Sequence, residues 1–418
     1  MSPGERPPPS GGAAAAVESL DFADPRLRQD PYPLYARLRA ADPVHYRARH
    51  GDWLLTRYAD IAAVMRDPRF GRKFIDSSVL RWQDVVRLRG RPKVPALLQG
   101  SRRLIDLWFV NRGVADHARL RTVVAPAFAA DRVAALRPRI EAIAERLLDE
   151  ASSSGEIELV SGVAFPLPVA VIGEILGITP TADFETWVTD IAACLDPVVL
   201  APTYVRGLFA MAAFTEHVRA EVQARPRGGE GLLDVLLGAR ERSALDDDEL
   251  IANCIFLLFA GHQTTRHLIG NGILALLRHP EQLALLRSEP GLISLAIEEL
   301  LRFDPPVQLV WRDVLEDADV AGAQMLAGDL VHLVIGAANR DPARFPEPDR
   351  LDIERRPNPH LAFAAGAHHC LGAGLARLEA EVVILALLRR APRLALAAEP
   401  EWETTYRARG LRSLRLAL

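Results

Sequence analysis

The chain has 418 residues, of which 49% are hydrophobic, so it can bury the core of one large domain or of two ordinary ones. Its 50 basic and 54 acidic residues give a net charge of −4, which argues against a protein that binds nucleic acid through phosphate contacts. The cysteines Cys194, Cys254 and Cys370 lie far apart, so the sequence indicates neither a disulfide framework nor a zinc cluster, and it favours a reducing compartment.

The N-terminal residues 1–20 are rich in Pro, Gly and Ala, a composition typical of a disordered tail. Their AAAAV run is much shorter than the ~20 apolar residues that span a bilayer, and they lack the basic start and longer apolar centre of a signal peptide. We therefore expect a cytoplasmic protein without a membrane anchor. Because no internal repeat or linker divides the remainder, residues 21–418 are expected to form one domain.

Long stretches with apolar residues at spacings of three and four predict a mainly α-helical protein with a small β-sheet region. The clearest predicted helices are residues 133–148, 250–277, 292–301 and 375–388. Extended segments are predicted at residues 44–46 and 53–56, which flank a turn at His50 and Gly51, at residues 330–334, and in the C-terminal tail.

The longest predicted helix covers residues 246–279 and would be roughly 50 Å long at ~1.5 Å per residue. Four acidic residues begin it and Pro280 ends it. Its middle reads FAGHQTT, in which Gly261 weakens the helix and Thr264 can bond back to the main chain. A local distortion here would leave room for a small ligand. The alternative is close packing against a neighbouring helix through small residues.

A later helical segment reads AIEELLRFDPP and places Glu299 and Arg302 on one helix face. Pairs of this kind are commonly solvated surface pairs worth ~0.5 kcal/mol. This pair, however, lies in an otherwise apolar helix that two prolines stop. Arg350, in the later segment FPEPDR, could reach back to complete a buried network.

The segment FAAGAHHCLG, residues 363–372, places Cys370 in a tight loop before a helix. Gly366 permits a positive backbone dihedral in the turn, and Gly372 lets a flat cofactor approach the main chain. Backbone N–H groups and the N-terminus of the following helix favour the negative charge of a metal-bound thiolate at Cys370. The alternative is an inert buried cysteine, which is a common role of a free thiol.

Taken together and in this order, these segments resemble the cytochrome P-450 family from about Asp21 onward. FAAGAHHCLG fits the family's haem-binding pattern F-x-x-G-x-H-x-C-x-G at every defined position. The resemblance implies the cytochrome P-450 fold, in which haem b, iron protoporphyrin IX, lies between a long central helix and the cysteine-ligand loop. It makes Cys370 the axial ligand of the haem iron, a thiolate that favours O–O cleavage, and it makes Phe363 and Gly372 cofactor-binding residues.

The resemblance also assigns roles to residues outside the cysteine loop. Those that match the family's oxygen-binding groove are Ala260, Gly261 and Thr264, and those that match its Glu-Arg-Arg core network are Glu299, Arg302 and Arg350. The residues that match its haem-propionate ligands are His117, Arg121, Arg312 and His368. A separate zinc site built from His368, His369 and Cys370 is not expected, because three adjacent residues rarely converge on one ion.

The chain departs from the family pattern at Gln263, where an acid usually precedes the threonine. Splitting dioxygen requires two protons, and an amide cannot titrate. We favour the interpretation that Thr264 and water deliver the protons. The alternatives are a substrate that supplies a hydroxyl or acid, and a reaction that does not need ordinary oxygen activation.

The substrate pocket implied by the resemblance lies on the side of the haem away from Cys370. Its walls are expected from residues 72–115, 184–214, 256–264 and 307–310. Four apolar residues indicate a largely hydrophobic substrate unless they are plain core packing: Phe256, Phe259, Val307 and Leu309. The basic segment 81–103 could meet an acidic group or a carrier domain, although a solvated loop is the more common role of such a segment.

The chain carries no flavin or iron–sulfur motif, so electrons must come from a separate partner. The resemblance implies a ferredoxin or flavodoxin that docks on the thiolate side, where Arg119 and Arg377 are candidate contacts for an acidic surface.

These observations predict a haem-thiolate monooxygenase that inserts one atom of dioxygen into a lipophilic small molecule, by hydroxylation or epoxidation of a secondary metabolite. One alternative is a haem-binding recruitment protein of the same fold with weak or no oxygen turnover, which Gln263 motivates. A second is a cysteine hydrolase with Cys370 as nucleophile and His368 or His369 as base, which leaves Glu299 and Arg302 unexplained.

Overall fold

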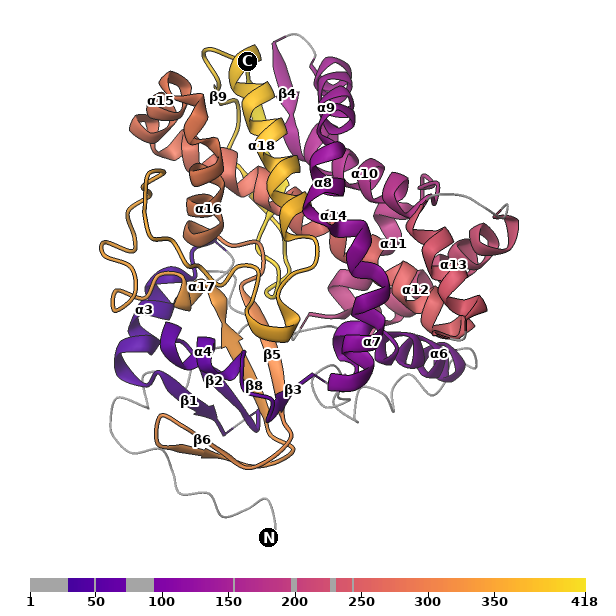
Figure 1. Ribbon diagram of the computed structural model, residues 1–418. Helices are drawn as coiled ribbons and strands as arrows, with labels where there is room; N and C mark the ends of the chain where they lie inside the picture. Colours follow the sequence, from indigo (N-terminus) through magenta and orange to yellow (C-terminus); the bar gives the residue numbers. More distant parts are fainter. Residues whose placement is uncertain are drawn as a thin grey trace.

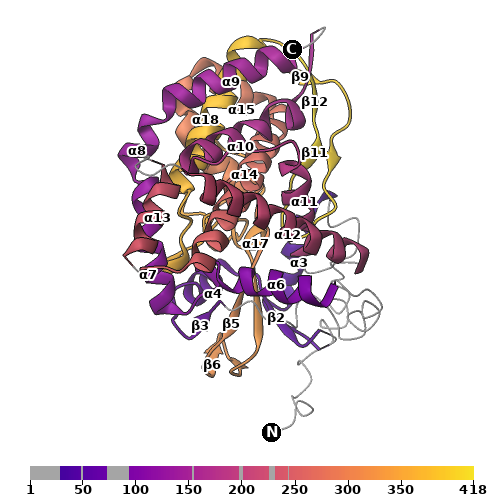
Figure 2. The same ribbon diagram turned by 90° about the vertical axis from the view of Figure 1, so that its right-hand side faces the viewer.

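A computed structural model of the protein describes residues 29–48, 50–72, 94–152, 155–196, 201–225, 231–242 and 244–418. The predicted tail at residues 1–20 and most of the basic segment 81–103 lie outside these residues. A β-sheet lies at the lower end of the molecule, and most of the helices lie above it in two perpendicular views (Figures 1 and 2). The predicted mainly helical fold with a small sheet region is confirmed.

The described helices follow the chain in numerical order. The α-helices are α3 Tyr32–Ala41, α4 Tyr58–Val64, α6 Val94–Asp106, α7 Val114–Val124, α8 Ala130–Ala135, α9 Arg137–Ala151, α10 Pro166–Leu176, α11 Phe184–Cys194, α12 Ala201–Ala224, α13 Leu232–Glu241, α14 Asp247–Arg278, α15 Pro280–Ser288, α16 Ile293–Phe303, α17 Ile335–Ala338 and α18 Ala373–Arg390. Short 3-10 or π turns are η2 Phe109–Asn111, η3 Ala125–Phe128, η4 Val160–Ala164, η5 Pro290–Leu292 and η6 Gly366–His368.

The main sheet has five strands in the order β1-β2-β8-β5-β3, and its pairs are antiparallel except β2 with β8. Its strands are β1 Val44–Arg47, β2 Asp52–Leu55, β3 Phe70–Gly71, β5 Leu309–Val314 and β8 Leu330–Val334. The smaller sheets contain β4 Glu156–Glu158, β6 Ala318–Val320, β7 Ala323–Met325, β9 Ala395–Leu396, β10 Glu401–Trp402, β11 Leu411–Ser413 and β12 Arg415–Ala417. The predicted extended segments are therefore confirmed as strands.

The long helix α14 begins and ends where the sequence predicts. Asp246 caps its N-terminus by accepting a hydrogen bond from the Glu249 backbone N–H at 2.7 Å, while the Glu249 carboxylate accepts one from the Asp246 N–H at 3.2 Å. This reciprocal pair satisfies two of the free N–H groups at the helix start. At the other end His279 breaks the helix before Pro280, which opens α15.

The predicted helix at residues 133–148 is divided. Helix α8 ends at Ala135 and α9 begins at Arg137, with Pro138 in its first turn. Proline has no N–H to donate and its ring disfavours helix in the residue before it, so it begins a new helix more readily than it continues one.

Helix α14 joins two hydrophobic cores. Its first half, up to Phe259, packs into a core with α10, α11, α12 and α13, and its second half, from Leu268, packs into a core with α9, α16 and α18. The stretch AGHQTT, residues 260–265, lies between them and carries small or polar side chains. This is the part of α14 where the molecule opens into a cavity.

None of the helices in the described ranges combines the length and the apolar character that a bilayer crossing requires.

Candidate active site around Cys370

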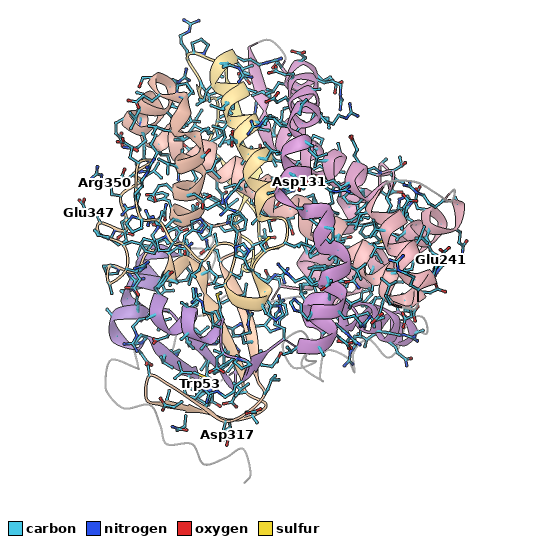
Figure 3. All side chains as sticks on the ribbon, in the orientation of Figure 1. Trp53, Asp131, Glu241, Asp317, Glu347 and Arg350 are labelled. Atoms are coloured by element: carbon cyan, nitrogen blue, oxygen red, sulfur yellow. The ribbon has the colours of Figure 1, made fainter. Side chains whose placement is uncertain are left out.

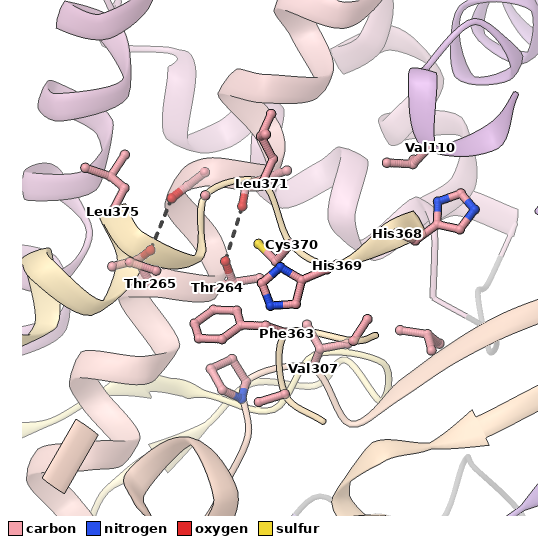
Figure 4. Close-up of a pocket in the computed structure, with 18 of the residues that line it drawn as sticks. Val110, Thr264, Thr265, Val307, Phe363, His368, His369, Cys370, Leu371 and Leu375 are labelled. Carbon is pink, nitrogen blue, oxygen red and sulfur yellow. Dashed lines mark hydrogen bonds between the residues drawn. The ribbon is translucent and has the colours of Figure 1, made fainter. Parts of the chain in front are cut away.

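A cavity of about 280 Å³ lies between the middle of α14 and the loop that carries Cys370 (Figure 4). Helix α14 contributes Phe256, Ala260, Gly261 and Thr264 to its lining. The cysteine loop and the start of α18 contribute Phe363, His368, His369, Cys370, Leu371, Gly372 and Leu375. Segments far apart in the sequence, one near residue 260 and one near residue 370, thus form the two opposite walls of one mostly apolar chamber.

The cysteine loop is held in a defined conformation by its own main chain. The Cys370 N–H donates to the Phe363 carbonyl at 2.9 Å, and the His369 N–H donates to the Gly366 carbonyl at 3.1 Å. Gly366 has φ +70, and a Cβ there would lie 2.7 Å from the Met65 carbonyl oxygen. Only glycine fits this position, because both the left-handed backbone and the close approach exclude a side chain.

Gly372 differs from Gly366, since a Cβ at Gly372 would meet no protein atom within 4 Å. The protein itself therefore does not require glycine there. The free space lies beside the cavity, where a flat cofactor would need to approach the main chain, as the sequence predicts.

Cys370 has an environment unlike that of the other two cysteines. Its side chain is exposed to the cavity, whereas Cys194 and Cys254 are buried in protein. Burial raises the pKa of the Cys194 and Cys254 thiols to about 12. Burial of the Cys370 thiol away from bulk water raises its pKa too, but the Gly372 backbone N–H and then the charges of Arg121 and Arg377 act in the opposite direction. Among the three cysteines, all within the described residues, Cys370 is therefore the one whose sulfur is placed to meet a ligand in the cavity.

The middle of α14 stays helical at the predicted distortion. The Thr264 hydroxyl donates to the Ala260 carbonyl at 3.2 Å, and the Thr265 hydroxyl donates to the Gly261 carbonyl at 3.2 Å, as Figure 4 shows. A Cβ on Gly261 would lie 3.2 Å from Ile172, so the small residue lets α10 pack closely while leaving space on the cavity side. Both predicted features, back-bonding and close packing, occur without a break in the helix.

Gln263 is buried but is not among the residues that line the cavity. The preceding His262 is also buried, and its ring packs edge-on against Phe165 and Phe184. Burial, offset in part by a hydrogen bond to the Leu258 carbonyl, lowers the pKa of His262 to about 4. Neither residue therefore places an ionisable acid beside Thr264.

The four predicted propionate ligands gather at one edge of the cavity. The rings of His117 and His368 lie 4.3 Å apart, and Arg121 donates to the His369 carbonyl at 2.8 Å. Several of their donors are buried without a hydrogen-bond partner among the described residues: His117 Nε2, His368 Nδ1, and Nε and Nη2 of Arg312. Buried polar atoms are nearly always paired, so this group of donors fits an acceptor that the protein itself does not provide.

The charges in this group are divided between its members. Burial, followed by the charge of Arg312, lowers the pKa of His368 to about 3, and burial also lowers the pKa of His117. The imidazoles are therefore neutral donors at pH 7, while Arg121 and Arg312 carry the positive charge. Two guanidinium groups and two imidazoles suit the two carboxylates of haem.

Arg72 is a further cation beside this group that the sequence did not identify. It lines the cavity, its buried Nε has no partner in the described part of the chain, and its charge acts on both His117 and His368. Its neighbours in RDPRFGR offer no pattern that would distinguish it from a surface arginine.

Glu299 and Arg302 form a fully buried ion pair, as predicted. Arg302 donates to both Glu299 oxygens at 2.7 and 2.8 Å, and its remaining N–H groups donate to the carbonyls of Asn339, Pro348 and Arg350. Both side chains are 0% exposed. Every guanidinium donor of Arg302 has a partner inside the protein.

The prediction that Arg350 is the third member of the network is wrong. Its side chain is 58% exposed and pairs with Glu347 at 3.1 Å, and Figure 3 shows both residues at the margin of the molecule. Arg355 takes the position instead and donates to both Glu299 oxygens at 3.2 Å. Arg350 follows a turn at Glu347, with φ +45, and it offers its carbonyl to Arg302 while its side chain is exposed. Arg355 in ERRPNPH was the signal that the sequence reading missed.

The predicted substrate contacts are only partly placed at the cavity. Phe256 and Val307 line it, together with Phe109, Val110, Ile172 and Val310. Phe259 instead stacks on Trp108, and Leu309 packs among Tyr32 and Tyr35. No described residue of the expected wall 184–214 lines the cavity. Phe259 and Leu309 therefore correspond to the core-packing alternative.

The two arginines proposed for partner docking already have partners in the chain. Arg119 pairs with Glu249 at 2.6 Å and with Asp116, which ties α7 to the start of α14. Arg377 pairs with Glu298 at 2.6 Å and lies over the Phe363 ring, which ties α18 to α16 beside the cysteine loop. Both remain partly exposed.

Comparisons with known proteins agree on one family. The family model described as Cytochrome P450 matches residues 209–391. Cytochrome P450 107B1 of Saccharopolyspora erythraea is 38% identical over 95% of this chain and 97% of its own, and the cytochrome P450 monooxygenase PikC of Streptomyces venezuelae is 39% identical over 96% and 94%. Among solved structures, P450BioI in complex with hexadec-9Z-enoic acid ligated acyl carrier protein superposes with a TM-score of 0.84, at 33% identity, over 94% of this chain and 100% of that one.

Proposed function

The chain belongs to the cytochrome P450 family, and on this basis we propose that Cys370 is the axial ligand of its haem and that His117, Arg121, Arg312 and His368 hold the haem propionates. The family's cofactor is haem b, and the chain is a monooxygenase. The observation that carries the residue assignment is that an exposed thiol lines the same cavity as His368, whose Nδ1 has no partner among the described residues. Further unpaired donors, on His117 and Arg312, lie near His368.

When bound, haem supplies the redox-active iron at which dioxygen is reduced. In the overall reaction one oxygen atom enters the substrate and the other leaves as water, which consumes two electrons and two protons. The backbone N–H of Gly372 and the nearby arginine charges stabilise the Cys370 thiolate. The residues of this chain must then position the substrate and move the protons.

Proton delivery falls to Thr264. Its hydroxyl lines the cavity on the wall opposite Cys370, and the bond to the Ala260 carbonyl fixes the position of the oxygen. Gln263 cannot release a proton, so water in the cavity has to resupply the Thr264 hydroxyl. A Thr264→Ala variant would still consume NAD(P)H through its redox partner but would form less product per electron.

The substrate is a lipophilic small molecule that the enzyme hydroxylates or epoxidises, as the apolar walls of the cavity favour. Phe256, Val307, Val310 and Ile172 are apolar, and they leave few polar groups to contact the body of a ligand. A substrate carried on an acyl carrier protein is compatible with the same chamber and is supported by the complex found for the structural relative. Membership of a secondary-metabolite pathway is part of the same proposal.

Electrons are expected from a ferredoxin or flavodoxin that docks near the cysteine loop. Since Arg119 and Arg377 are both engaged in ion pairs within the chain, an acidic partner would have to compete with Glu249 and Glu298 for them. Reversing the charge of both arginines should slow the first reduction in a salt-dependent manner, and stopped-flow reduction at two salt concentrations measures this. Unchanged kinetics would remove the two residues from the docking surface.

The haem-binding recruitment protein remains the second candidate, and Gln263 is the residue that favours it. The Thr264 hydroxyl in the cavity argues for turnover. Product formation per electron in the Gln263→Glu variant, compared with the unaltered protein, separates the two.

The assignment of Cys370 is tested by the absorption spectrum of the reduced protein with carbon monoxide bound. We expect a thiolate-type Soret band for the unaltered chain and for Cys194→Ala, which removes a buried cysteine away from the cavity, and loss of that band for Cys370→Ala. A thiolate-type band that persists in Cys370→Ala would overturn the assignment. Titration of the ferric protein with terpenes, macrolides, fatty acids and aromatic compounds then identifies the substrate class by displacement of iron-bound water.

A further inference from the structure

Two arginines lie over the same indole, and one of them, Arg72, lines the cavity. The guanidinium carbon of Arg72 lies 4.6 Å from the centroid of the Trp311 ring, and that of Arg407 lies 5.7 Å from it. Arg72 follows β3, Trp311 lies in β5, and Arg407 lies in the loop before β11. We call these three residues the Trp311 clamp.

The main chain fixes the clamp beside the cavity wall. The Gln308 N–H donates to the Arg407 carbonyl at 3.0 Å, and Val307, which lines the cavity, pairs with Ala408 in an isolated β-bridge. On the other side, Arg72 itself lines the cavity. The clamp is therefore built on paired backbone and not on a free side chain.

The clamp carries charge that the haem does not require. The proposed propionate ligands already supply two guanidinium groups, Arg121 and Arg312, for two carboxylates. Arg72 and Arg407 are additional cations, and in the described part of the chain neither has a carboxylate within ion-pair distance. The charge of Asp313 acts on Arg72 and that of Asp196 on Arg407, and Asp196 accepts the backbone N–H groups of Tyr406 and Arg407 at 2.5 and 3.2 Å.

The surroundings of both arginines disfavour their charged form. Burial, followed by the charges of Arg312 and Arg407, lowers the pKa of Arg72 to about 9, and burial lowers the pKa of Arg407. A guanidinium stacked on an indole is held flat with its N–H edge free, which is the geometry for two parallel hydrogen bonds to a carboxylate or phosphate. An anion between these groups would relieve both the repulsion and the missing hydrogen bond of Arg72 Nε.

We propose that the Trp311 clamp binds an anionic group of the substrate and so holds the rest of the molecule in the apolar chamber that faces Thr264. The inference rests on the proposed function and adds to it the chemical class of the substrate, an amphiphile with one negatively charged end. Two sources present this chemistry: the carboxylate of a free acid and the phosphodiester of a carrier protein's phosphopantetheine arm.

The test measures the binding of matched pairs of probes to the haem-loaded protein. Binding is monitored by the spin-state shift of the Soret band. Myristic acid and tetradecan-1-ol share one chain and differ in charge; myristoyl-phosphopantetheine and myristoyl-pantetheine differ only in the phosphate. We expect the unaltered protein to prefer the charged member of at least one pair about tenfold or more, and the pair that shows the preference identifies the source.

The variants Arg72→Gln and Arg407→Gln should each reduce that preference about tenfold while leaving the dissociation constant of the neutral member nearly unchanged. Arg350→Gln, which removes an exposed charge far from the cavity, serves as the control and should keep the preference. No preference in the unaltered protein, or equal losses for the charged and neutral members, would overturn the proposal.

Haem content distinguishes the clamp from a propionate site. If Arg72 holds a propionate, Arg72→Gln should lose haem as Arg312→Gln does, and that result would also overturn the proposal. The thiolate-type carbonyl band reports separately on the proposed function. Its absence from the unaltered protein would reject the haem-thiolate assignment, whereas its presence with no charge preference would reject the clamp alone.

Discussion

Two buried clusters of charged and polar side chains differ in how their hydrogen-bond donors are used. In the network of Glu299, Arg302 and Arg355, the guanidinium of Arg302 finds all its acceptors within the protein. In the cluster of His117, Arg312 and His368, of which His368 lines the cavity, several buried donors have no acceptor among the described residues. A completed network stabilises the fold by itself, whereas an incomplete one indicates where a ligand has to supply the missing half.

The largest expected effect comes from breaking the completed network. Arg302→Met would leave the Glu299 carboxylate buried without its main partner and should lower the free energy of unfolding by about 3–5 kcal/mol. Urea unfolding measures this change. The exposed Arg350→Gln should change stability by less than ~0.5 kcal/mol. Similar values for the two variants would contradict both the buried network and the replacement of Arg350 by Arg355.

Removing a donor from the cluster of His117, Arg312 and His368 should weaken haem binding without lowering the stability of the apoprotein. Arg312→Gln takes away a buried cation whose pKa burial lowers to about 10, so the apoprotein should be as stable as the unaltered one or slightly more stable. Haem should dissociate about 10–100-fold faster, because a charge-assisted hydrogen bond to a propionate is lost. Haem transfer to excess apomyoglobin gives the rate. A large loss of apoprotein stability would instead make Arg312 a structural residue.

A smaller, pH-dependent effect is expected from Glu298, a carboxylate that, like Glu299, has its hydrogen-bond partners within the protein. Burial raises the pKa of Glu298, but hydrogen bonds from His360 and Arg377 outweigh it and lower the pKa to about 2. The folded-state pKa lies below the unfolded value, so this stabilisation is fully present above about pH 4.5 and is lost as the pH falls towards 2.

Glu298→Gln should therefore destabilise the protein by about 1–3 kcal/mol near pH 7, and the difference should shrink in acid. Unfolding titrations of both proteins from pH 7 to about pH 3 provide the comparison. A difference that stays constant over this range would show that the carboxylate charge is not what matters.

The smallest effect is expected from adding a carboxylate on the α14 side of the cavity. Gln263→Glu should keep the coupling of NAD(P)H use to product within about twofold of the unaltered protein, or raise it, because Thr264 and water already deliver protons. Product per NAD(P)H is the readout. A large loss of coupled product would show that the amide itself is required.

The positions of the main helices and of the cysteine loop were predictable from local sequence signals. The acidic cap and Pro280 located both ends of α14, and apolar periodicity located α16 and α18. The cysteine loop was predictable because Gly366 has to be glycine. These features depend on residues close together in the chain, where spacing alone carries the information.

The parts that failed depend on which way a side chain turns in three dimensions. Arg350 and Arg355 lie five residues apart in one loop, and only the folded path of that loop turns Arg355 toward Glu299 and Arg350 toward Glu347. Phe259 lies on α14 like Phe256 but faces Trp108 and not the cavity. The sequence around Arg72 has no local pattern that marks it, and its proposed role rests on its place in the cavity wall and on an Nε that has no partner among the described residues.

The central claim is that the unpaired donors around Cys370 are completed by haem. A crystal structure of the haem-loaded protein tests it most directly. We predict an iron–sulfur bond to Cys370, propionate oxygens within hydrogen-bond distance of Arg312 and His368, and no propionate on Arg72 or Arg407. Propionates bound to the Trp311 clamp, with the donors of Arg312 and His368 still unpaired, would contradict this account of the site.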